Sequence, residues 1–117
     1  KVYYKEAYTN RGQAKRKLND IPGAIEDYTT AIKLDPNEKD AYLGRGLAKK
    51  ELKDYDGALK DLDIAVNLEP TYAKSYTARG EVKFLKGDVT GACNDLLKAQ
   101  KLGYMVAMAA FKDYCDK

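Results

Sequence analysis

The chain repeats one pattern at intervals of 34 residues, and this period limits its fold more than any other feature. Gly12, Gly46 and Gly80 follow one another at this spacing. The same offset aligns three stretches: GAIEDYTTAIKLDP from Gly23, GALKDLDIAVNLEP from Gly57 and GACNDLLKAQKLGY from Gly91. A period between about 20 and 50 residues is typical of stacked repeats, in which each unit buries its apolar face only against its neighbours. We therefore expect a single domain of stacked units over residues 1–117.

Each unit is predicted to contain two helices. Residues 40–52 contain no proline and place Tyr42 and Gly46 at helical spacing, and Asp54 then marks a turn and a helix N-cap. Residues 57–68 place apolar side chains at positions i, i+1, i+4, i+7 and i+8, which form one face of a second helix. Pro70 prevents its continuation, as Pro36 does in the first unit. The chain is thus predicted to be all-α.

The recurring glycines indicate close contact between the two helices of a unit. Glycine inside a helix costs about 1 kcal/mol relative to alanine, so three at one phase need a steric reason. We expect them to lie against the partner helix at Ala24, Ala58 and Ala92, with Tyr28, Leu62 and Leu96 filling the wider part of each hairpin.

These residues resemble the tetratricopeptide repeat (TPR) family. The family pattern is matched in the second unit by Tyr42, Gly46, Ala58, Leu62, Ala65 and Pro70. The first unit matches as well, and so does the third, except that Tyr104 replaces the final proline in the third unit. The resemblance implies a right-handed superhelical solenoid of three hairpins, over residues 5–38, 39–72 and 73–103, closed by a capping helix over residues 104–115.

Charged residues occupy two columns where the family often has leucine or an aromatic residue. The first column holds Arg11, Arg45 and Arg79, and the second, on the other helix, holds Asp27, Asp61 and Asp95. A correlated change of this kind indicates contact, so we predict an Arg–Asp ladder that joins neighbouring units, with Asp27 paired to Arg45 and Asp61 to Arg79. Lys15, Lys49 and Lys83 replace a tyrosine of the family pattern, and we expect their stems to reach past the core to water.

The resemblance also implies a binding face. First helices of TPR domains line a concave groove that holds extended peptides or partner helices. The corresponding positions here are Thr9, Gln13, Arg16, Leu43, Leu47, Lys50, Lys74, Thr77, Glu81 and Phe84. Leu43, Leu47 and Phe84 have two open interpretations: an exposed apolar strip in the groove, or packing between adjacent units.

Some TPR domains grip the terminal carboxylate of a chaperone with a clamp of Lys, Asn and Arg. Those roles fall here on Thr9, Gln13, Gly44, Lys74 and Ala78. Only Lys74 is of the required type, and one lysine cannot supply the converging donors that carboxylate recognition needs. We therefore do not expect a chaperone-tail clamp.

Composition removes several function classes. The chain has no histidine, no phosphate-binding glycine motif and no distinct pair of carboxylates, so we predict no catalysis, no metal and no cofactor. Its 21 basic and 18 acidic residues are interspersed, which does not favour nucleic-acid or membrane binding. No apolar run approaches the roughly 20 residues that cross a bilayer. We expect a monomeric scaffold that binds a protein or peptide.

Two alternative functions remain at the sequence level. The first is a structural spacer within a longer repeat array, for which Tyr3 and Tyr4 leave room for an upstream neighbour. The second is single-stranded RNA binding, which would need a strongly basic groove with stacking aromatic residues. The chain begins with Lys1 rather than Met, so we expect a processed or excised piece.

The two cysteines lie at similar heights on either side of the turn near Gly103. Cys93 precedes this turn in the last unit, and Cys115 ends the predicted capping helix. They form either a disulfide, which would indicate an oxidising compartment, or two reduced thiols in a small apolar contact. The ending resembles bacterial TPR proteins in which this cap recurs, which favours a location outside the cytoplasm.

Overall fold

The computed structural model describes residues 2–115, with side chains from residue 4 onward. Lys1, from which we expected a processed or excised piece, lies outside the described residues, and so does the side chain of Tyr3, which we connected with an upstream neighbour. Every regular element of the described chain is a helix, and the helices are α1 (Val2–Lys17), α2 (Ile21–Leu34), α3 (Lys39–Glu51), α4 (Tyr55–Leu68), α5 (Ala73–Leu85), α6 (Val89–Lys101) and α7 (Val106–Cys115). The expected all-α fold is confirmed.

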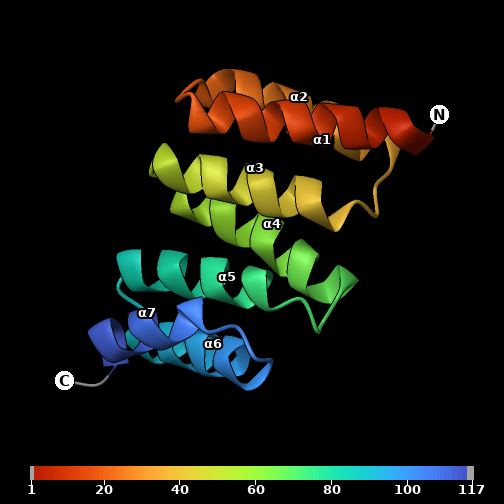
Figure 1. Cartoon of the computed structure of the whole chain (residues 1–117). Coiled ribbons are helices and arrows are strands. Elements are labelled where there is room, and N and C mark those ends of the chain that lie inside the picture. The colour runs from red at the N-terminus through yellow and green to blue at the C-terminus, as the bar shows by residue number, and fades with distance from the viewer. Residues whose placement is uncertain (1, 116–117) are drawn as a thin grey trace.

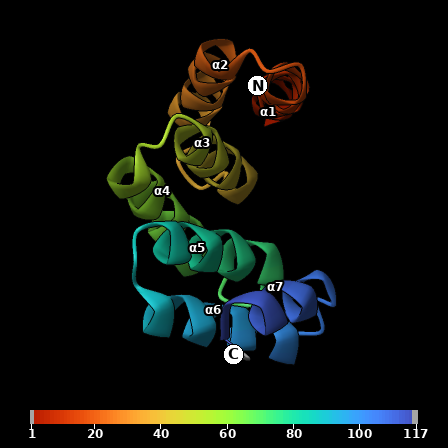
Figure 2. The same cartoon turned by 90° about the vertical axis from the view of Figure 1, so that its left-hand side faces the viewer.

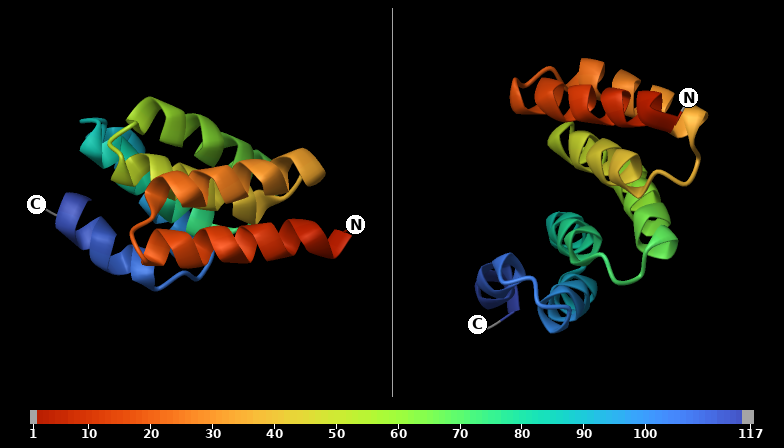
Figure 3. Two further views of the ribbon diagram at one scale, coloured as in Figure 1. Left: turned by 90° about the horizontal axis from the view of Figure 1, so that it is seen from above. Right: turned by 45° about the vertical axis from the view of Figure 1, so that its right-hand side comes forward.

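The helices form three hairpins, α1–α2, α3–α4 and α5–α6, stacked in chain order with α7 against the last (Figure 1). The stack measures 46 × 26 × 21 Å. Within the described residues α1 contacts α3, α3 contacts α5 and α5 contacts α7, whereas the second helices do not contact one another. The stack therefore curves, with the first helices on its inner face (Figure 2). Successive hairpins are also turned relative to one another, which gives a solenoid (Figure 3).

Each hairpin turns in the same way. Asp20, Asp54 and Asp88 each accept a hydrogen bond from the backbone N–H three residues later, at 3.1, 3.0 and 2.9 Å. These aspartates are the N-caps of α2, α4 and α6, as predicted for Asp54. The residue before each cap has a left-handed backbone, with φ of 67° at Asn19, 65° at Lys53 and 97° at Gly87.

The glycine column lies where the two helices of a hairpin come closest, which confirms the steric prediction. A Cβ on Gly46 would lie 2.8 Å from Leu62 Cγ and 3.3 Å from the Ala58 carbonyl oxygen. A Cβ on Gly80 would lie 3.1 Å from the Ala92 carbonyl oxygen. In the first hairpin the neighbour is the Tyr28 ring, 2.9 Å from a Cβ on Gly12.

The side chain at the Tyr28 position also packs against the next hairpin. Tyr28 is fully buried, and a Cβ on Gly44 of α3 would overlap its ring. One period later the smaller Leu62 is fully buried in a cluster with Ala78 of α5. A large residue thus faces glycine at the first junction, and a smaller residue faces alanine at the second.

The predicted pairing of the Arg–Asp ladder between neighbouring units is wrong, because the pairs form within each hairpin. Arg11 donates from Nε and Nη2 to both carboxylate oxygens of Asp27, each at 2.8 Å. Arg45 binds Asp61, and Arg79 binds Asp95, in the same two-pronged way. Because the glycine column brings the two helices together, the guanidinium reaches the aspartate of its own hairpin rather than that of the preceding hairpin.

Each ladder aspartate also forms an ion pair with the lysine one turn after the arginine on the first helix. Nζ of Lys15, Lys49 and Lys83 lies 3.2, 3.1 and 3.0 Å from a carboxylate oxygen of Asp27, Asp61 and Asp95. The lysines therefore end on a buried carboxylate rather than in water. Two cations offset the cost of burying each aspartate.

Neighbouring hairpins are joined by Nη1 of the ladder arginines, the guanidinium nitrogen that does not bind the aspartate. Arg45 Nη1 donates to Thr29 Oγ1 at 3.2 Å, and Arg79 Nη1 donates to Asp63 Oδ1 at 3.0 Å. Both acceptors lie on the second helix of the preceding hairpin. The arginines thus link units as expected, but through Thr29 and Asp63.

The contact between Tyr28 and Gly44 predicts compensation in a double variant. We expect Gly44→Ala to lower the free energy of unfolding by about 1–3 kcal/mol through overpacking, and Tyr28→Leu to lower it by a similar amount through a cavity. The double variant recreates the pair of leucine and alanine at the second junction, so it should be more stable than the sum of the single effects by at least about 1 kcal/mol. Urea denaturation measures all four proteins, and strict additivity would contradict the contact.

The ladder predicts a pH-dependent loss of stability in acid. The hydrogen bond from Arg11, supported by Lys15, holds the pKa of Asp27 below its ordinary value. The stabilisation is therefore complete above the unfolded-state pKa of about 3.9 and is lost as the pH falls through the folded-state pKa.

We expect Asp27→Asn to lower the free energy of unfolding by about 1–3 kcal/mol at neutral pH, and the difference from wild type to shrink toward pH values of about 3. Urea denaturation over this pH range measures the difference. Asp113→Asn, at an exposed position of α7, serves as the control. A difference for Asp27→Asn that stays constant across the range would show that its charge is not the cause.

Candidate functional site

Two hollows follow each other along the inner face. The first, of about 280 Å³, is lined by Lys5, Glu6, Thr9, Asn10, Glu38 and Asp40. The second, of about 220 Å³, is lined by Gln13, Arg16, Asp40, Leu43, Gly44, Leu47, Tyr72, Lys74 and Tyr104. Both include Asp40, and we call the two hollows together the inner groove. Five of the ten groove positions named from the sequence line the second hollow: Gln13, Arg16, Leu43, Leu47 and Lys74.

Leu43 and Leu47 form part of the apolar wall of the second hollow. They lie one turn apart on α3. Leu43 is only 8% exposed and belongs to the core cluster with Leu62 and Val82, and Leu47 packs against the same cluster. They therefore pack between units and present only an edge to the groove, so the expectation of a fully exposed strip is wrong for Leu43.

Phe84 does not extend this wall. Its ring stacks on Tyr114 of α7, with centroids 3.9 Å apart and planes inclined by 7°. The capping helix covers the position where the sequence suggested a third exposed apolar residue. The apolar part of the groove is thus shorter than the sequence implied.

The two threonines named for the groove are buried. Thr9 Oγ1 donates to the Lys5 carbonyl oxygen at 3.0 Å, and Thr77 Oγ1 donates to the Ala73 carbonyl oxygen at 3.2 Å. Each hydroxyl is satisfied by its own helix. Their expected role in side-chain recognition is therefore not supported, although Thr9 lines the first hollow.

Three of the four charged residues among the groove positions named from the sequence are paired across neighbouring first helices. Arg16 Nη1 lies 3.4 Å from Glu51 Oε1, and Lys50 Nζ lies 3.6 Å from Glu81 Oε1. Lys74 is exposed and has no ion pair within the described part of the chain. Lys74 is therefore the groove cation most available to a ligand.

Two of the five clamp positions, Gly44 and Ala78, are taken up by packing, whereas Gln13 and Lys74 are exposed. The Tyr28 ring occupies the space beside Gly44, and Ala78 is buried. A larger polar side chain at position 44 would collide with Tyr28. The geometry therefore agrees with the absence of converging donors inferred from the sequence.

Sequence reasoning missed Tyr72 and Tyr104, which complete the second hollow. Tyr72 precedes α5, and its hydroxyl donates to Asp40 Oδ1 at 3.0 Å. Burial first, and then this hydrogen bond, raises the pKa of Tyr72 to about 12, so the hydroxyl stays protonated at neutral pH. Both tyrosines lie in connections between helices, where helical periodicity carries no signal. Their one cue was aromatic character beside the turns at Pro70 and Gly103.

The first hollow is acidic at one end. Burial, followed by the charge of Asp40, raises the pKa of Glu38 above its ordinary value.

Among the residues that the structure describes, no three His, Cys, Asp or Glu side chains come together as metal ligands. No described helix has the length and apolar character that crossing a membrane requires.

The comparisons with known proteins agree with this geometry. A family model described as TPR repeat matches residues 12–53, and one described as tetratricopeptide repeat matches residues 39–72. No curated protein sequence matches the chain.

Solved TPR domains superpose on almost the whole chain. The first TPR domain of human RPAP3 covers 99% of this chain and 93% of its own, with a TM-score of 0.94 and 23% identity. The first TPR of Spaghetti (RPAP3), bound to the HSP90 peptide SRMEEVD, covers 99% and 94%, with a TM-score of 0.92 and 23% identity. The TPR2B domain of yeast Sti1, in a complex with pHsp70, covers 88% and 82%, with a TM-score of 0.82 and 22% identity. These structures share the fold of the chain. The two family models, which together span residues 12–72, show that the chain belongs to the tetratricopeptide repeat family.

Proposed function

We propose that this chain is a non-catalytic protein-interaction scaffold whose inner groove binds a peptide segment or a helix of a partner protein. The observation that carries the proposal is the second hollow, where leucine and tyrosine side chains lie among polar groups beside an exposed lysine that pairs with no described charge. Ligand sites usually combine apolar surface with a few placed polar groups. The peptide ligands named for the TPR domains of Spaghetti and yeast Sti1 support a ligand of this class.

The chemistry of the hollow suggests how a ligand is held. An apolar side chain would contact the edges of Leu43 and Leu47 and the rings of Tyr72 and Tyr104. An acidic or carbonyl oxygen next to it would face Lys74. Because clamp donors are missing beside Gly44 and at Ala78, the lysine would set the orientation of the ligand and the apolar contact would add to its affinity.

The rigidity of the stack favours binding, because the groove does not have to order itself around the ligand. The ladder fixes each hairpin, and the Arg45–Thr29 and Arg79–Asp63 contacts fix the hairpins to one another. A groove that is already formed loses little conformational entropy when a ligand enters. The Cys93–Cys115 disulfide supports a role in an oxidising compartment outside the cytoplasm.

A charge reversal in the groove tests the proposal. Peptides are selected on the wild-type protein from a displayed library of random sequences, and their affinities are measured by fluorescence polarisation. We expect Lys74→Glu to weaken the selected peptides by about tenfold at low salt and by less at high salt, because the lost attraction is screened by ions.

The matched control is Lys60→Glu, which makes the same charge change at an exposed position of α4. It should bind the selected peptides like the wild type, since its helix lies outside the row of first helices. Equal affinities for all three proteins would place recognition elsewhere and favour the spacer function.

A further inference from the structure

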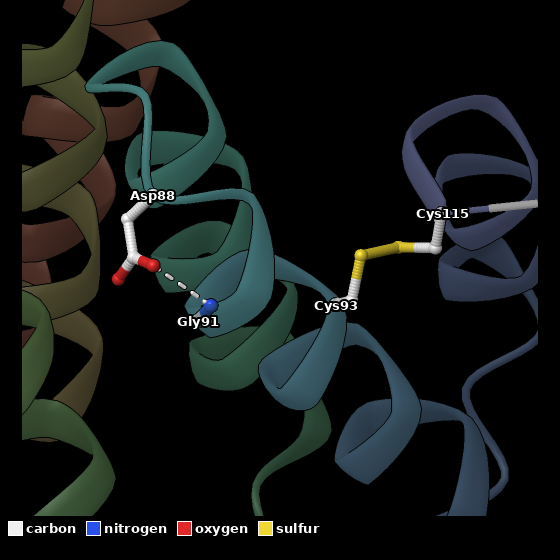
Figure 4. Close-up of a disulfide and its surroundings, with 4 residues drawn as sticks. All are labelled: Asp88, Gly91, Cys93 and Cys115. Atoms are coloured by element: carbon white, nitrogen blue, oxygen red, sulfur yellow. Dashed lines mark hydrogen bonds between the residues drawn. A yellow bond between two sulfur atoms is a disulfide. The ribbon is translucent and has the colours of Figure 1, made fainter. Parts of the chain in front are cut away.

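The capping helix is tied to the last hairpin by a disulfide between Cys93 of α6 and Cys115 of α7, with their Cα atoms 5.8 Å apart (Figure 4). Cys115 is the last residue of α7, so the covalent tie holds the end of the helix that is farthest from the connecting turn. Both cysteines are partly exposed, which leaves the bond open to attack by a thiolate.

At this end α7 covers part of the inner face. Tyr114, next to Cys115, lies flat on Phe84 of α5. Phe84 stands at one of the groove positions named from the sequence. The capping helix therefore marks where the open groove stops.

α7, a helix of 10 residues, packs along α6 and touches α5. Ala107 is its one fully buried residue, while Met105 before it, Val106 and Met108 are exposed. Ala110, Phe111 and Tyr114 add partly buried contacts to the cluster around Leu96 and Ala99. An isolated helix of this length is marginal in water, so its position depends strongly on its attachment.

The repeat pattern also changes in α7. Tyr114 stands one period after Gly80, in the glycine column that receives the second helix of each hairpin. A tyrosine at this position fills the space that the second helix of a hairpin occupies beside α1, α3 and α5, so α7 departs from the framework of the repeats.

We propose that the Cys93–Cys115 disulfide is a redox latch that sets the length of the inner groove. In the oxidised protein α7 covers Phe84. A dithiol reductant breaks the S–S bond by transferring two electrons and two protons, which yields two cysteine thiols and the oxidised, cyclic disulfide of the reductant. α7 then detaches, and Phe84 joins the groove. This regulation rests on the proposed function of the groove, whereas the release of α7 does not.

Hydrogen exchange followed by mass spectrometry tests the release without any ligand. The oxidised protein is compared with protein reduced by dithiothreitol, and with the double variant Cys93→Ala, Cys115→Ala under both conditions. We expect amide protection in α7 to fall by about tenfold or more on reduction, while protection in α1 to α4 changes by less than about twofold. The double variant should match the reduced protein and should not respond to the reductant.

Two results would overturn the latch. Unchanged protection of α7 on reduction would mean that packing alone holds the helix. A loss of protection throughout the chain would mean that the disulfide supports the whole fold rather than the cap.

A second measurement addresses the groove. Peptides from the displayed random library are selected separately on oxidised and on reduced protein. We expect some peptides selected on reduced protein to bind it about tenfold more tightly than the oxidised form, and to lose this preference in Phe84→Ser. If α7 is released but no peptide distinguishes the two forms, the latch does not regulate the groove. This failure differs from that of the groove itself, which would appear as no effect of Lys74→Glu.

Discussion

The buried aspartate of each hairpin is the constraint on which the rest of the fold depends. Asp27 and Asp61 are only 2% exposed. A carboxylate buried to this extent needs cations within ion-pair distance to offset its desolvation. Arg45 and Lys49 do this for Asp61 from the facing helix, and the rigid fork of the guanidinium fixes both distance and rotation. The remaining Nη1 then reaches back to Thr29 of the preceding hairpin. One buried charge thus orients a hairpin internally and also sets its contact with its neighbour.

The inner face is less independent of packing than the variation among repeats suggests. Gly44 differs from Ala78 one period later because Tyr28 is larger than Leu62 at the adjoining position, so the difference compensates volume. Leu43 is likewise mostly a core residue. Positions that differ between repeats are therefore of two kinds. Some, such as Gly44, follow the size of a buried neighbour, and others, such as Lys74, project freely and are available for recognition.

The sequence was sufficient for the helices, their order and the close contacts at Gly46 and Gly80, because a strict period and a steric exclusion are local signals. It was insufficient for the direction of the ladder, since two columns on facing helices can pair within a unit or between units, and only the distance between the helices decides. It was also insufficient for Tyr72 and Tyr104, which lie in turns outside any helical period. The covering of Phe84 by the Tyr114 ring depends on the position of α7. The repeat pattern does not predict this position, because Tyr114 departs from the pattern.

The ladder also changes what the net charge says about partners. The formal charge of +3 counts 21 basic residues, but Arg11, Arg45, Arg79, Lys15, Lys49 and Lys83 are committed to ladder aspartates. Arg16 and Lys50 pair with Glu51 and Glu81 between neighbouring first helices. A polyanion lying along these helices would have to compete with the carboxylates for the same cations. Among the described residues that line the inner groove, Lys74 is the cation without an ion pair, and it suits a single acidic or carbonyl oxygen rather than a row of phosphates.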